Sequence, residues 1–461
     1  MTRAMRAAMF VSVLLLAPMA LHAQTGADAD KTDAKADANT DQRSTGLPSR
    51  INWRLNFDAG WGSFGFANSL FNNPKEKGVD EDLSDQWFEG YIKPTLSATY
   101  TLASTSVIYG KIGAVGERTY GSVPENFGHD VSSFGPEDLS IGWRSGDALP
   151  GLGPNALDFV VGRTQYRLGH GFLLWDGAAE GGSRGGYWTN ARKAFEFAAI
   201  GRLKPGRHTV ETFYLDRDEL DESDSGSRLW GTNYEYSFGP ATTVGATYMK
   251  WAAHADMKPG RDGLNVFNIR SYMAPLQRHP GLSFEIEYAS ERNGEALDSN
   301  AWTIQGAYDF AKLTWKPKVT YRYASFQGDD PDTSANEAFD PLFLGFSDWG
   351  TWWQGEIAGE YFLSNSNLNS HLVRVHASPF DSVSGGLMFF KFSLDEPRSA
   401  GPNVTSSDVA FETNLYVDWK LNGNFTISFI GAYGDPGKAV QQQSGRTKNF
   451  AYGMAYVGYS Y

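Results

Sequence analysis

From Ile51 onward, apolar and polar residues alternate with a period of two. In the first such stretch, Ile51, Trp53 and Leu55 alternate with polar side chains, and residues 284–288 and 408–420 repeat the pattern. Successive side chains of a strand point to opposite faces, so each of these segments has one face suited to hydrocarbon and one suited to water. The alternation predicts strands that separate lipid from water.

Aromatic residues support a membrane setting for these strands. They make up 14% of the chain, against 20% charged residues, and 51 glycines provide many turn positions. A soluble β-sandwich also alternates, but it rarely exposes so many rings. Rings near predicted strand ends fit the interfacial girdles of outer-membrane barrels. The girdle positions expected here are Trp143, Trp175, Trp188, Trp251, Trp315 and Tyr459.

The N-terminal segment predicts export. Arg3 and Arg6 precede an apolar stretch that is shorter than the roughly 20 residues of a membrane span, and Ala23 offers a small residue for cleavage. We interpret residues 1–23 as a signal peptide. Residues 24–50 contain few large apolar side chains and are predicted to form a disordered periplasmic tail. Residues 51–461 form the predicted barrel in the bacterial outer membrane.

The connections predict the number of strands. Short turns are expected at Thr101 to Ser104, Lys204 to Arg207, Gly239 to Pro240 and Asn422 to Asn424. Longer polar connections are expected at Gly121 to Pro136, Gly169 to Thr189 and Gln327 to Gly345. About nineteen segments could be strands, whereas single-chain bacterial barrels have an even number with both termini in the periplasm. We therefore assign Trp349 to Ser364 to an outer loop or plug, which leaves about eighteen strands.

The C-terminus carries a further membrane signal. Val457, Tyr459 and Tyr461 place an apolar or aromatic residue at every second position up to the last residue. This resembles the terminal strand signal that the outer-membrane insertion machinery reads. The sequence thus predicts an all-β, transmembrane antiparallel barrel with long extracellular loops.

Charge and cysteine content exclude several functions. The net charge of -13 argues against a nucleic-acid partner, which requires a basic surface. The absence of cysteine excludes thiolate metal sites and cysteine nucleophiles. The acidic segments Asp216 to Asp224 and Asp329 to Asp340 lack the spacing of an EF-hand loop and are interpreted as solvated loops. We predict no metal site and no cofactor.

The faces that point away from lipid carry many cations. The cations assigned to the lumen are Arg54, Lys93, Lys111, Arg144, Arg163, Arg167, Arg192, Arg270, Lys316, Lys318, Arg322, Arg374 and Lys391. The acids assigned there are Asp58, Glu89, Glu196, Glu235, Glu285, Glu287, Asp309, Glu412 and Asp418. Arg163, Gln165 and Arg167 share a face in the expected strand Asp158 to Leu168. Guanidinium groups bind carboxylates through paired hydrogen bonds, so they predict selection of an anionic solute. Alternatively, each arginine pairs with a lumenal glutamate and braces the wall.

One short motif raises a catalytic alternative. Gly181 to Gly185 matches the G-x-S-x-G pattern around Ser183, but this nucleophile elbow requires a strand-turn-helix setting and a partner histidine. Here the motif lies in a glycine-rich outer loop. We expect no enzyme activity and keep an outer-membrane hydrolase as the least favoured alternative.

The stretch from Phe339 to Phe392 resembles the C-terminal half of the alginate-export family of outer-membrane barrels. It contains FDPLF, then a Trp-rich segment, then NSNL, a strand and a short Pro-Phe-Asp turn. The resemblance implies an eighteen-stranded barrel that exports a polyuronate through an arginine-lined constriction. Arg374 is the only candidate constriction residue inside the matching stretch.

These observations lead to one hypothesis and two alternatives. We expect a monomeric outer-membrane channel that exports an anionic, alginate-like polysaccharide, with the lipid bilayer, lipopolysaccharide and the insertion machinery as partners and with periplasmic export partners left open. The alternatives are an uptake porin for small anionic solutes or oligosaccharides, and the hydrolase. The residues predicted to line the substrate path are Arg54, Lys93, Arg144, Arg163, Arg167, Arg192, Arg270, Arg322 and Arg374.

Overall fold

The computed structural model describes residues 51–71, 85–102, 105–124, 130–239, 242–274, 278–344 and 354–461. The expected signal peptide (residues 1–23) and periplasmic tail (residues 24–50) lie outside the described residues and stay predictions.

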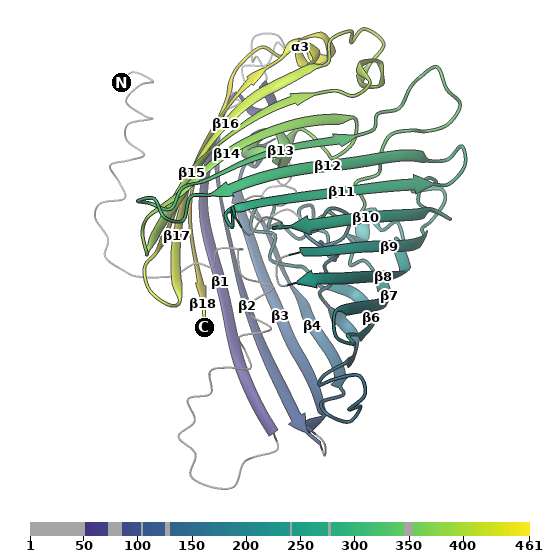
Figure 1. Cartoon of the computed structure of the whole chain (residues 1–461). Coiled ribbons are helices and arrows are strands. Elements are labelled where there is room, and N and C mark those ends of the chain that lie inside the picture. The colour runs from purple at the N-terminus through teal and green to yellow at the C-terminus, as the bar shows by residue number, and fades with distance from the viewer. Residues whose placement is uncertain are drawn as a thin grey trace.

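Eighteen antiparallel strands in the described part of the chain form one sheet, and β1 pairs with β18 to close it into a barrel (Figure 1). The fold predicted from the alternation is therefore confirmed. The strands are β1 (Ile51–Ala67), β2 (Asp85–Thr101), β3 (Val107–Gly121), β4 (Val131–Arg144), β5 (Leu157–Thr164), β6 (Phe195–Leu203), β7 (His208–Asp216), β8 (Arg228–Gly239), β9 (Thr242–Ala252), β10 (Asn265–Met273), β11 (Leu282–Arg292), β12 (Asp298–Asp309), β13 (Lys318–Phe326), β14 (Leu368–Phe380), β15 (Val383–Ser393), β16 (Asp408–Lys420), β17 (Phe425–Pro436) and β18 (Phe450–Ser460).

Among the residues that the structure describes, helical structure is confined to short segments in the connections. The helices are η2 (Ser69–Phe71), η5 (Asp221–Ser223), η6 (Gly355–Gly359), η7 (Pro397–Ala400) and α3 (Lys438–Ser444). None of the described helices combines the length and the apolar character needed to cross a bilayer.

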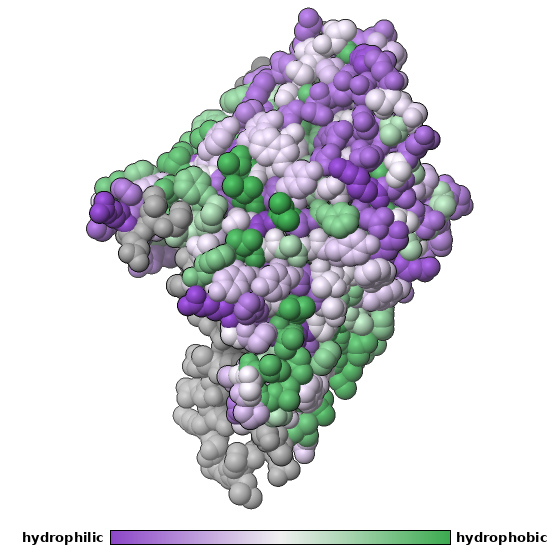
Figure 2. Space-filling model, turned by 45° about the vertical axis from the view of Figure 1, so that its right-hand side comes forward, coloured by the Kyte–Doolittle hydropathy of each residue, from purple (hydrophilic) through white to green (hydrophobic). Residues whose placement is uncertain are grey.

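The period of two sorts side chains between the two faces of the wall. In β1, Trp53 and Trp61 are 73% and 53% exposed on the outer face, whereas Phe64 is buried inside the barrel. Figure 2 shows the outcome on one side of the molecule: green hydrophobic residues lie on the lower wall, and purple hydrophilic residues gather toward the top. This distribution is the one a bilayer imposes on a barrel wall.

The two ends of the barrel differ in the length of their connections. Residues 204–207 and 421–424 make short turns at the end that holds the start of β1 and the end of β18. The opposite end carries residues 165–194 between β5 and β6, and residues 327–367 between β13 and β14. Short turns mark the periplasmic end of outer-membrane barrels, so the long connections are extracellular.

Three expectations about segment boundaries are settled by the structure. The described part of the segment expected to be a plug, residues 354–364, contains η6 and no strand, which confirms that assignment; residues 349–353 lie outside the described residues. The polar connection expected up to Pro136 is shorter than predicted, because β4 begins at Val131. The strand expected to reach Leu168 ends at Thr164.

The two longest connections meet inside the barrel. Phe172 packs against the inward-facing Phe326, with ring centres 5.7 Å apart, and Phe343 packs against the inward-facing Trp251 at 4.8 Å. All four rings are buried. The backbone N–H of Trp175 also donates to the carbonyl oxygen of Phe343 at 2.8 Å. An apolar core therefore fills part of the extracellular half of the lumen.

Candidate lumenal transport site

Two neighbouring strands present cations to the lumen. Lys318 and Arg322 lie on the inner face of β13, and Arg374 and His376 lie on the inner face of β14. The antiparallel register places His376 beside Lys318 and places Arg374 opposite Thr320, which lies between Lys318 and Arg322. The period of two thus brings four nitrogen-bearing side chains onto one patch of the wall.

Tyr416 of β16 holds two members of this patch in place. Its phenol oxygen accepts hydrogen bonds from Nε and Nη2 of Arg374, at 2.9 and 2.6 Å. Nδ1 of His376 lies 2.8 Å from the same oxygen. Because a guanidinium only donates, the phenol hydrogen is available for Nδ1 of His376. The arrangement fixes the plane of the Arg374 guanidinium.

The connection between β5 and β6 reaches the lumen wall near an acidic residue. His170 stacks on Tyr272 with ring centres 3.9 Å apart, and its Nδ1 lies 3.1 Å from a carboxylate oxygen of Glu285. The side chains of His170 and Glu285 are 44% and 32% exposed. These two groups therefore face water inside the barrel and contribute a polar, partly acidic surface.

Arg270, predicted to contact solute, is bound into the wall. Its Nη2 donates to Glu235 and Asn233, each at 2.6 Å, and its Nη1 donates to Thr247 and Asn268, each at 2.9 Å. The side chain is 1% exposed. A guanidinium surrounded in this way cross-links strands β8, β9 and β10, which is the bracing alternative raised by the sequence.

Lys93 and Arg192 hold an inward-folded loop. Lys93 pairs with Glu137 at 2.7 Å, and Arg192 pairs with Glu117 at 3.0 Å. Arg192 belongs to the connection between β5 and β6 and not to a strand. A third glutamate, Glu89, accepts hydrogen bonds from the backbone N–H groups of residues 188 and 189, each at 3.0 Å. Glu137 also accepts the backbone N–H of Lys193 at 2.9 Å. Consecutive strands β2, β3 and β4 therefore each supply one carboxylate that pins residues 188–193 to the wall.

An acid of the loop itself, Glu180, also approaches the Arg192 guanidinium. Glu180 approaches Nε of Arg192 at 3.8 Å and accepts a hydrogen bond from its backbone N–H at 2.8 Å. Burial raises the pKa of Glu180 well above its ordinary value, and the nearby charge of Glu117 raises it further. The neutral acid is thus favoured for Glu180, which limits the charge buried at this anchor.

Three more of the predicted arginines occupy different environments. Arg163 points inward at a bulge in β5 and pairs with Asp218 at 2.6 Å. Arg144 pairs with Asp158 at 2.8 Å near the periplasmic end. Arg167 lies in the connection after β5, with its guanidinium 4.7 Å from the ring centre of Trp175. The expected shared face of Arg163, Gln165 and Arg167 is therefore absent, because the strand ends before Gln165.

Arg54 lies on the inner face of β1 toward the periplasmic end, beside Ser97 of β2. Lys391, expected inside, is on the outer face of β15, where it pairs with Asp408 of β16. Lys316 lies in the turn before β13. For Lys391 the assumed strand phase was wrong by one residue, which reverses the face. For Lys316 the predicted limit of the strand was wrong.

The aromatic girdle prediction also needs correction. Trp251 is 1% exposed and points into the barrel. Trp175 and Trp188 belong to the inward-folded connection between β5 and β6, where Trp188 donates its Nε1 hydrogen to Glu356 at 3.2 Å. Trp315, by contrast, is 61% exposed near the periplasmic end. Ring type alone did not separate interfacial residues from those that pack loops inside the lumen.

A buried carboxylate of β16 holds the segment that contains η6. The two oxygens of Glu412 accept hydrogen bonds from the backbone N–H groups of Ile357 and Ala358, at 3.0 and 2.8 Å. Asn414 accepts one from the backbone N–H of Glu356 at 3.0 Å. Free N–H groups at the start of a helical turn are well suited to such acceptors. The sequence placed Glu412 in the lumen, but nothing in it identified this partner.

Ser183 of the G-x-S-x-G segment is bound to a glutamate of a neighbouring connection. Both the hydroxyl and the backbone N–H of Ser183 donate to Glu222, each at 2.9 Å. In the described part of the chain, no hydrogen bond joins Ser183 to a histidine. The described residues also contain no group of three or more His, Cys, Asp or Glu side chains placed to hold a metal ion.

Comparisons with known proteins agree with this architecture. The family model described as alginate export matches residues 151–454. Among curated proteins, no sequence matches the chain. Similar solved structures include OccK5 (OpdH) of Pseudomonas aeruginosa, with 10% identity, a TM-score of 0.56, and coverage of 88% of this chain and 97% of that one. OccAB2 of Acinetobacter baumannii has 11% identity, a TM-score of 0.54, and coverage of 88% and 98%.

A third neighbour is the outer membrane protein opdK of Pseudomonas aeruginosa, with 12% identity, a TM-score of 0.54, and coverage of 88% of this chain and 98% of that one. At such identities the likeness shows the fold alone, whereas the family model covers most of the chain. The closed barrel, its lumenal cations and the family match together indicate a channel of the bacterial outer membrane. The chain belongs to the alginate-export family.

Proposed function

We propose that this channel conducts an anionic, alginate-like polysaccharide from the periplasm to the outside. The observation that carries the proposal is the inner-face patch of Lys318, Arg322, Arg374 and His376 on two neighbouring strands. Guanidinium groups recognise carboxylates by charge and by paired hydrogen bonds, and a polyuronate presents one carboxylate per sugar. The matched family region includes all four residues.

The arginines fall into two groups in this proposal. Arg163, Arg192 and Arg270 are held by carboxylates and support loops or the wall. Arg374 is assigned to the substrate path, and Arg322, which is 3% exposed, is its buried neighbour on β13. Tyr416 orients Arg374, so part of the cost of ordering that side chain is met before the substrate arrives. Passage then requires a series of weak contacts, because a single tight site would hold the polymer.

Acidic groups near the extracellular end favour outward movement. Exposed carboxylates there include Asp221, Glu222 and Asp224. They repel a polyanion that approaches from outside, whereas the cationic patch attracts one that has entered from the periplasm. The charge pattern along the barrel therefore supports export.

A specific observation also supports a second candidate, uptake of small anionic solutes. The apolar core of Phe172, Phe326, Trp251 and Phe343 fills part of the extracellular half of the lumen. A narrowed lumen suits a small carboxylate better than an extended polymer, unless the loops move. The two candidates differ in the size of solute that passes.

Ion selectivity of single channels in planar bilayers tests the proposal. We expect the wild type to prefer anions and to be blocked by oligouronates, and we expect Arg322→Ala/Arg374→Ala to lose both properties. The control is Lys391→Ala, which removes a cation from the outer face of the wall. Cation selectivity that the double variant leaves unchanged would overturn the cationic path. Flux of small carboxylates without oligouronate block would favour the uptake candidate.

A further inference from the structure

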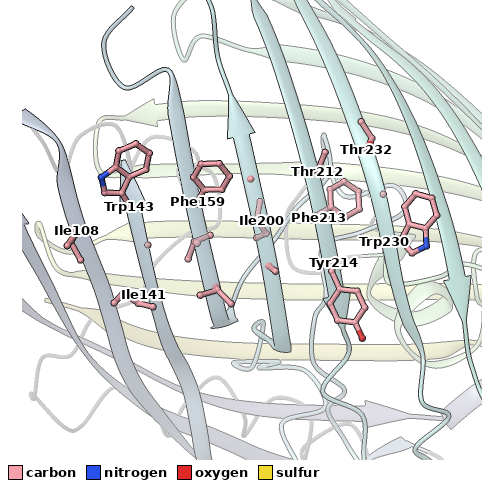
Figure 3. Close-up of a pocket in the computed structure, with 16 residues that line it drawn as sticks. Ile108, Ile141, Trp143, Phe159, Ile200, Thr212, Phe213, Tyr214, Trp230 and Thr232 are labelled. Atoms are coloured by element: carbon pink, nitrogen blue, oxygen red, sulfur yellow. The ribbon is translucent and has the colours of Figure 1, made fainter. Parts of the chain in front are cut away.

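The two faces of the barrel wall differ in where titratable groups lie. On the outer face a groove crosses β3 to β8, where Gly201 lies opposite Phe159 in register (Figure 3). All sixteen residues that line this groove are uncharged, as contact with hydrocarbon requires. Inside the barrel, by contrast, four carboxyl groups gather around residues 354–364, the segment that contains η6.

Two of these carboxyl groups belong to the segment itself and have few hydrogen-bond partners. Glu356 is 1% exposed, and its Oε2 accepts the Nε1 hydrogen of Trp188 at 3.2 Å. Its Oε1 is buried and has no hydrogen-bond partner in the part of the chain that the structure describes. Glu360 follows four residues later on the same side of the helical turn, close enough for its charge to act on Glu356.

The other two carboxyl groups belong to the wall and are surrounded by donors. Glu89 of β2 accepts hydrogen bonds from two backbone N–H groups of the connection between β5 and β6, each at 3.0 Å. Glu412 of β16 accepts hydrogen bonds from two backbone N–H groups of η6, at 3.0 and 2.8 Å. The charge of Glu412 acts on Glu356, and the charge of Glu89 acts on Glu360.

The remaining neighbours of the segment compensate little of this negative charge. Strands β17 and β18 face it with Gly434 and with the hydroxyl group of Tyr452. The hydroxyl group of Tyr361, within the segment, lies among the same acids, and its ring centre is 6.0 Å from that of Tyr452. Lys193 acts on Glu360, but its Nζ already pairs with Asp176 at 3.2 Å.

Two more negative charges would therefore be costly in this part of the lumen. Burial raises the pKa of Glu356 well above its ordinary value of 4.5, and the charges of Glu360 and Glu412 raise it further. Burial and the charge of Glu89 raise the pKa of Glu360 to about 8, although Lys193 opposes this shift. At neutral pH both groups hold their protons, so the segment lies in the lumen with its own two acids uncharged.

We propose that residues 354–364 form a proton-controlled closure of the channel. While Glu356 and Glu360 are protonated, the segment stays attached to β16 through Glu412. When they lose their protons, Glu89 and Glu412 repel them, the segment leaves the wall, and the lumen widens. The proposal rests on the channel function and holds for either candidate solute.

The direction of the response follows from the raised pKa of Glu360. In the released segment this group is exposed to water and has its ordinary pKa of 4.5, against about 8 in the attached segment. Its contribution to attachment is complete below about pH 4.5, weakens as the pH rises, and is lost above about pH 8. Alkaline solution therefore opens the channel.

Single-channel conductance of the full-length barrel, recorded from about pH 5 to about pH 9, tests the closure. We expect the conductance of the wild type to rise with pH. Glu356→Gln/Glu360→Gln keeps neutral side chains of the same shape and should lose this rise. Glu360→Gln alone should move the rise to higher pH, because only Glu356 then ionises. The control, Glu196→Gln/Glu295→Gln, replaces two exposed acids and should respond as the wild type does.

Backbone hydrogen exchange at residues 354–364, compared between proteins at one alkaline pH, identifies the moving part. The wild type should lose protection there, and Glu356→Gln/Glu360→Gln should keep it. A conductance independent of pH in the wild type, an equal rise in the double variant, or a rise while these residues stay protected would overturn the proposal. A pore without anion selectivity that still opens in this way would reject the proposed solute and support the closure.

Discussion

Arg261 and Asp340 form a two-pronged ion pair that joins two extracellular connections. Nε of Arg261 lies 2.6 Å from Oδ2 of Asp340, and Nη2 lies 2.6 Å from Oδ1. The guanidinium also lies 5.3 Å from the ring centre of Phe343. Their side chains are 7% and 18% exposed. The pair therefore anchors the connection between β13 and β14 beside the apolar core of the lumen.

Removing one partner of this pair should release the connection. We expect Asp340→Ala to destabilise the local structure by about 3 kcal/mol, because a buried guanidinium is left without its charge partner. Backbone hydrogen exchange at residues 339–344 should become faster, and single-channel currents should become noisier. Arg398→Ala, which removes an exposed ion pair with Asp332 at 2.8 Å, is the control and should leave both measurements unchanged. Equal effects of the two variants would show that the anchor has no special role.

The same pair predicts a response to acid. Burial by itself raises the pKa of Asp340, but the hydrogen bonds and charge of Arg261 hold this pKa below its ordinary value of 3.8. Because the folded-state pKa is lowered, the stabilisation is complete above about pH 4 and is lost as the pH falls further through the folded-state pKa. Channel noise should rise in that window in the wild type. It should already be high and independent of pH in Asp340→Asn; noise that follows pH equally in both proteins would assign the effect to another group.

Glu412 is expected to control the segment that contains η6. Glu412→Ala removes the acceptor of two backbone N–H groups, those of Ile357 and Ala358, and should weaken the attachment of this segment by about 3 kcal/mol. We expect larger single-channel conductance, because the segment can then leave the wall. Glu412→Gln keeps one acceptor oxygen and should show an intermediate effect. Conductance that stays at the wild-type value in both variants would show that the segment does not limit the pore.

Gly162 is expected to be essential for the bulge in β5. Its φ is +117°, and a Cβ would lie 2.2 Å from the carbonyl oxygen of Leu139. Gly162→Ala should therefore lower the free energy of unfolding by about 2 kcal/mol or more, and should disturb the Arg163–Asp218 pair. Urea unfolding of the barrel in detergent measures this change. Gly431→Ala is the control, because its Cβ would meet no atom within 4 Å; a similar loss in both would refute the steric explanation.

Barrel architecture was predictable because the bilayer imposes a local rule on every strand. In β1 and β16 the side chains alternate between lipid and lumen as the sequence suggests, and parity led to eighteen strands. The assignment failed where the limit or the phase of a strand was misjudged. Arg167 was assigned to a strand that ends at Thr164, and Lys391 was assigned to the wrong face of β15, where it lies outside together with Leu387.

Partners inside the lumen were not predictable in the same way. Lys93 and Glu137 are 44 residues apart, and Arg163 and Asp218 are 55 apart, yet each pair is in contact. A residue's strand phase shows that it faces inward, but not whether a loop folds in to meet it. The sequence therefore identified a cationic lumen without distinguishing arginines that brace the wall from those assigned to the substrate.

The amino-acid sequence by itself determined the closed, membrane-spanning sheet. Side-chain alternation and turn length are properties of neighbouring residues, and every strand of the barrel faces the same bilayer. Only the tertiary structure decided which lumenal charges are paired, how Glu412 holds Ile357 and Ala358, and where small residues meet large ones to form the outer groove. These features depend on register between strands and on loops that return into the barrel. Both join residues distant in the chain, and no local pattern encodes them.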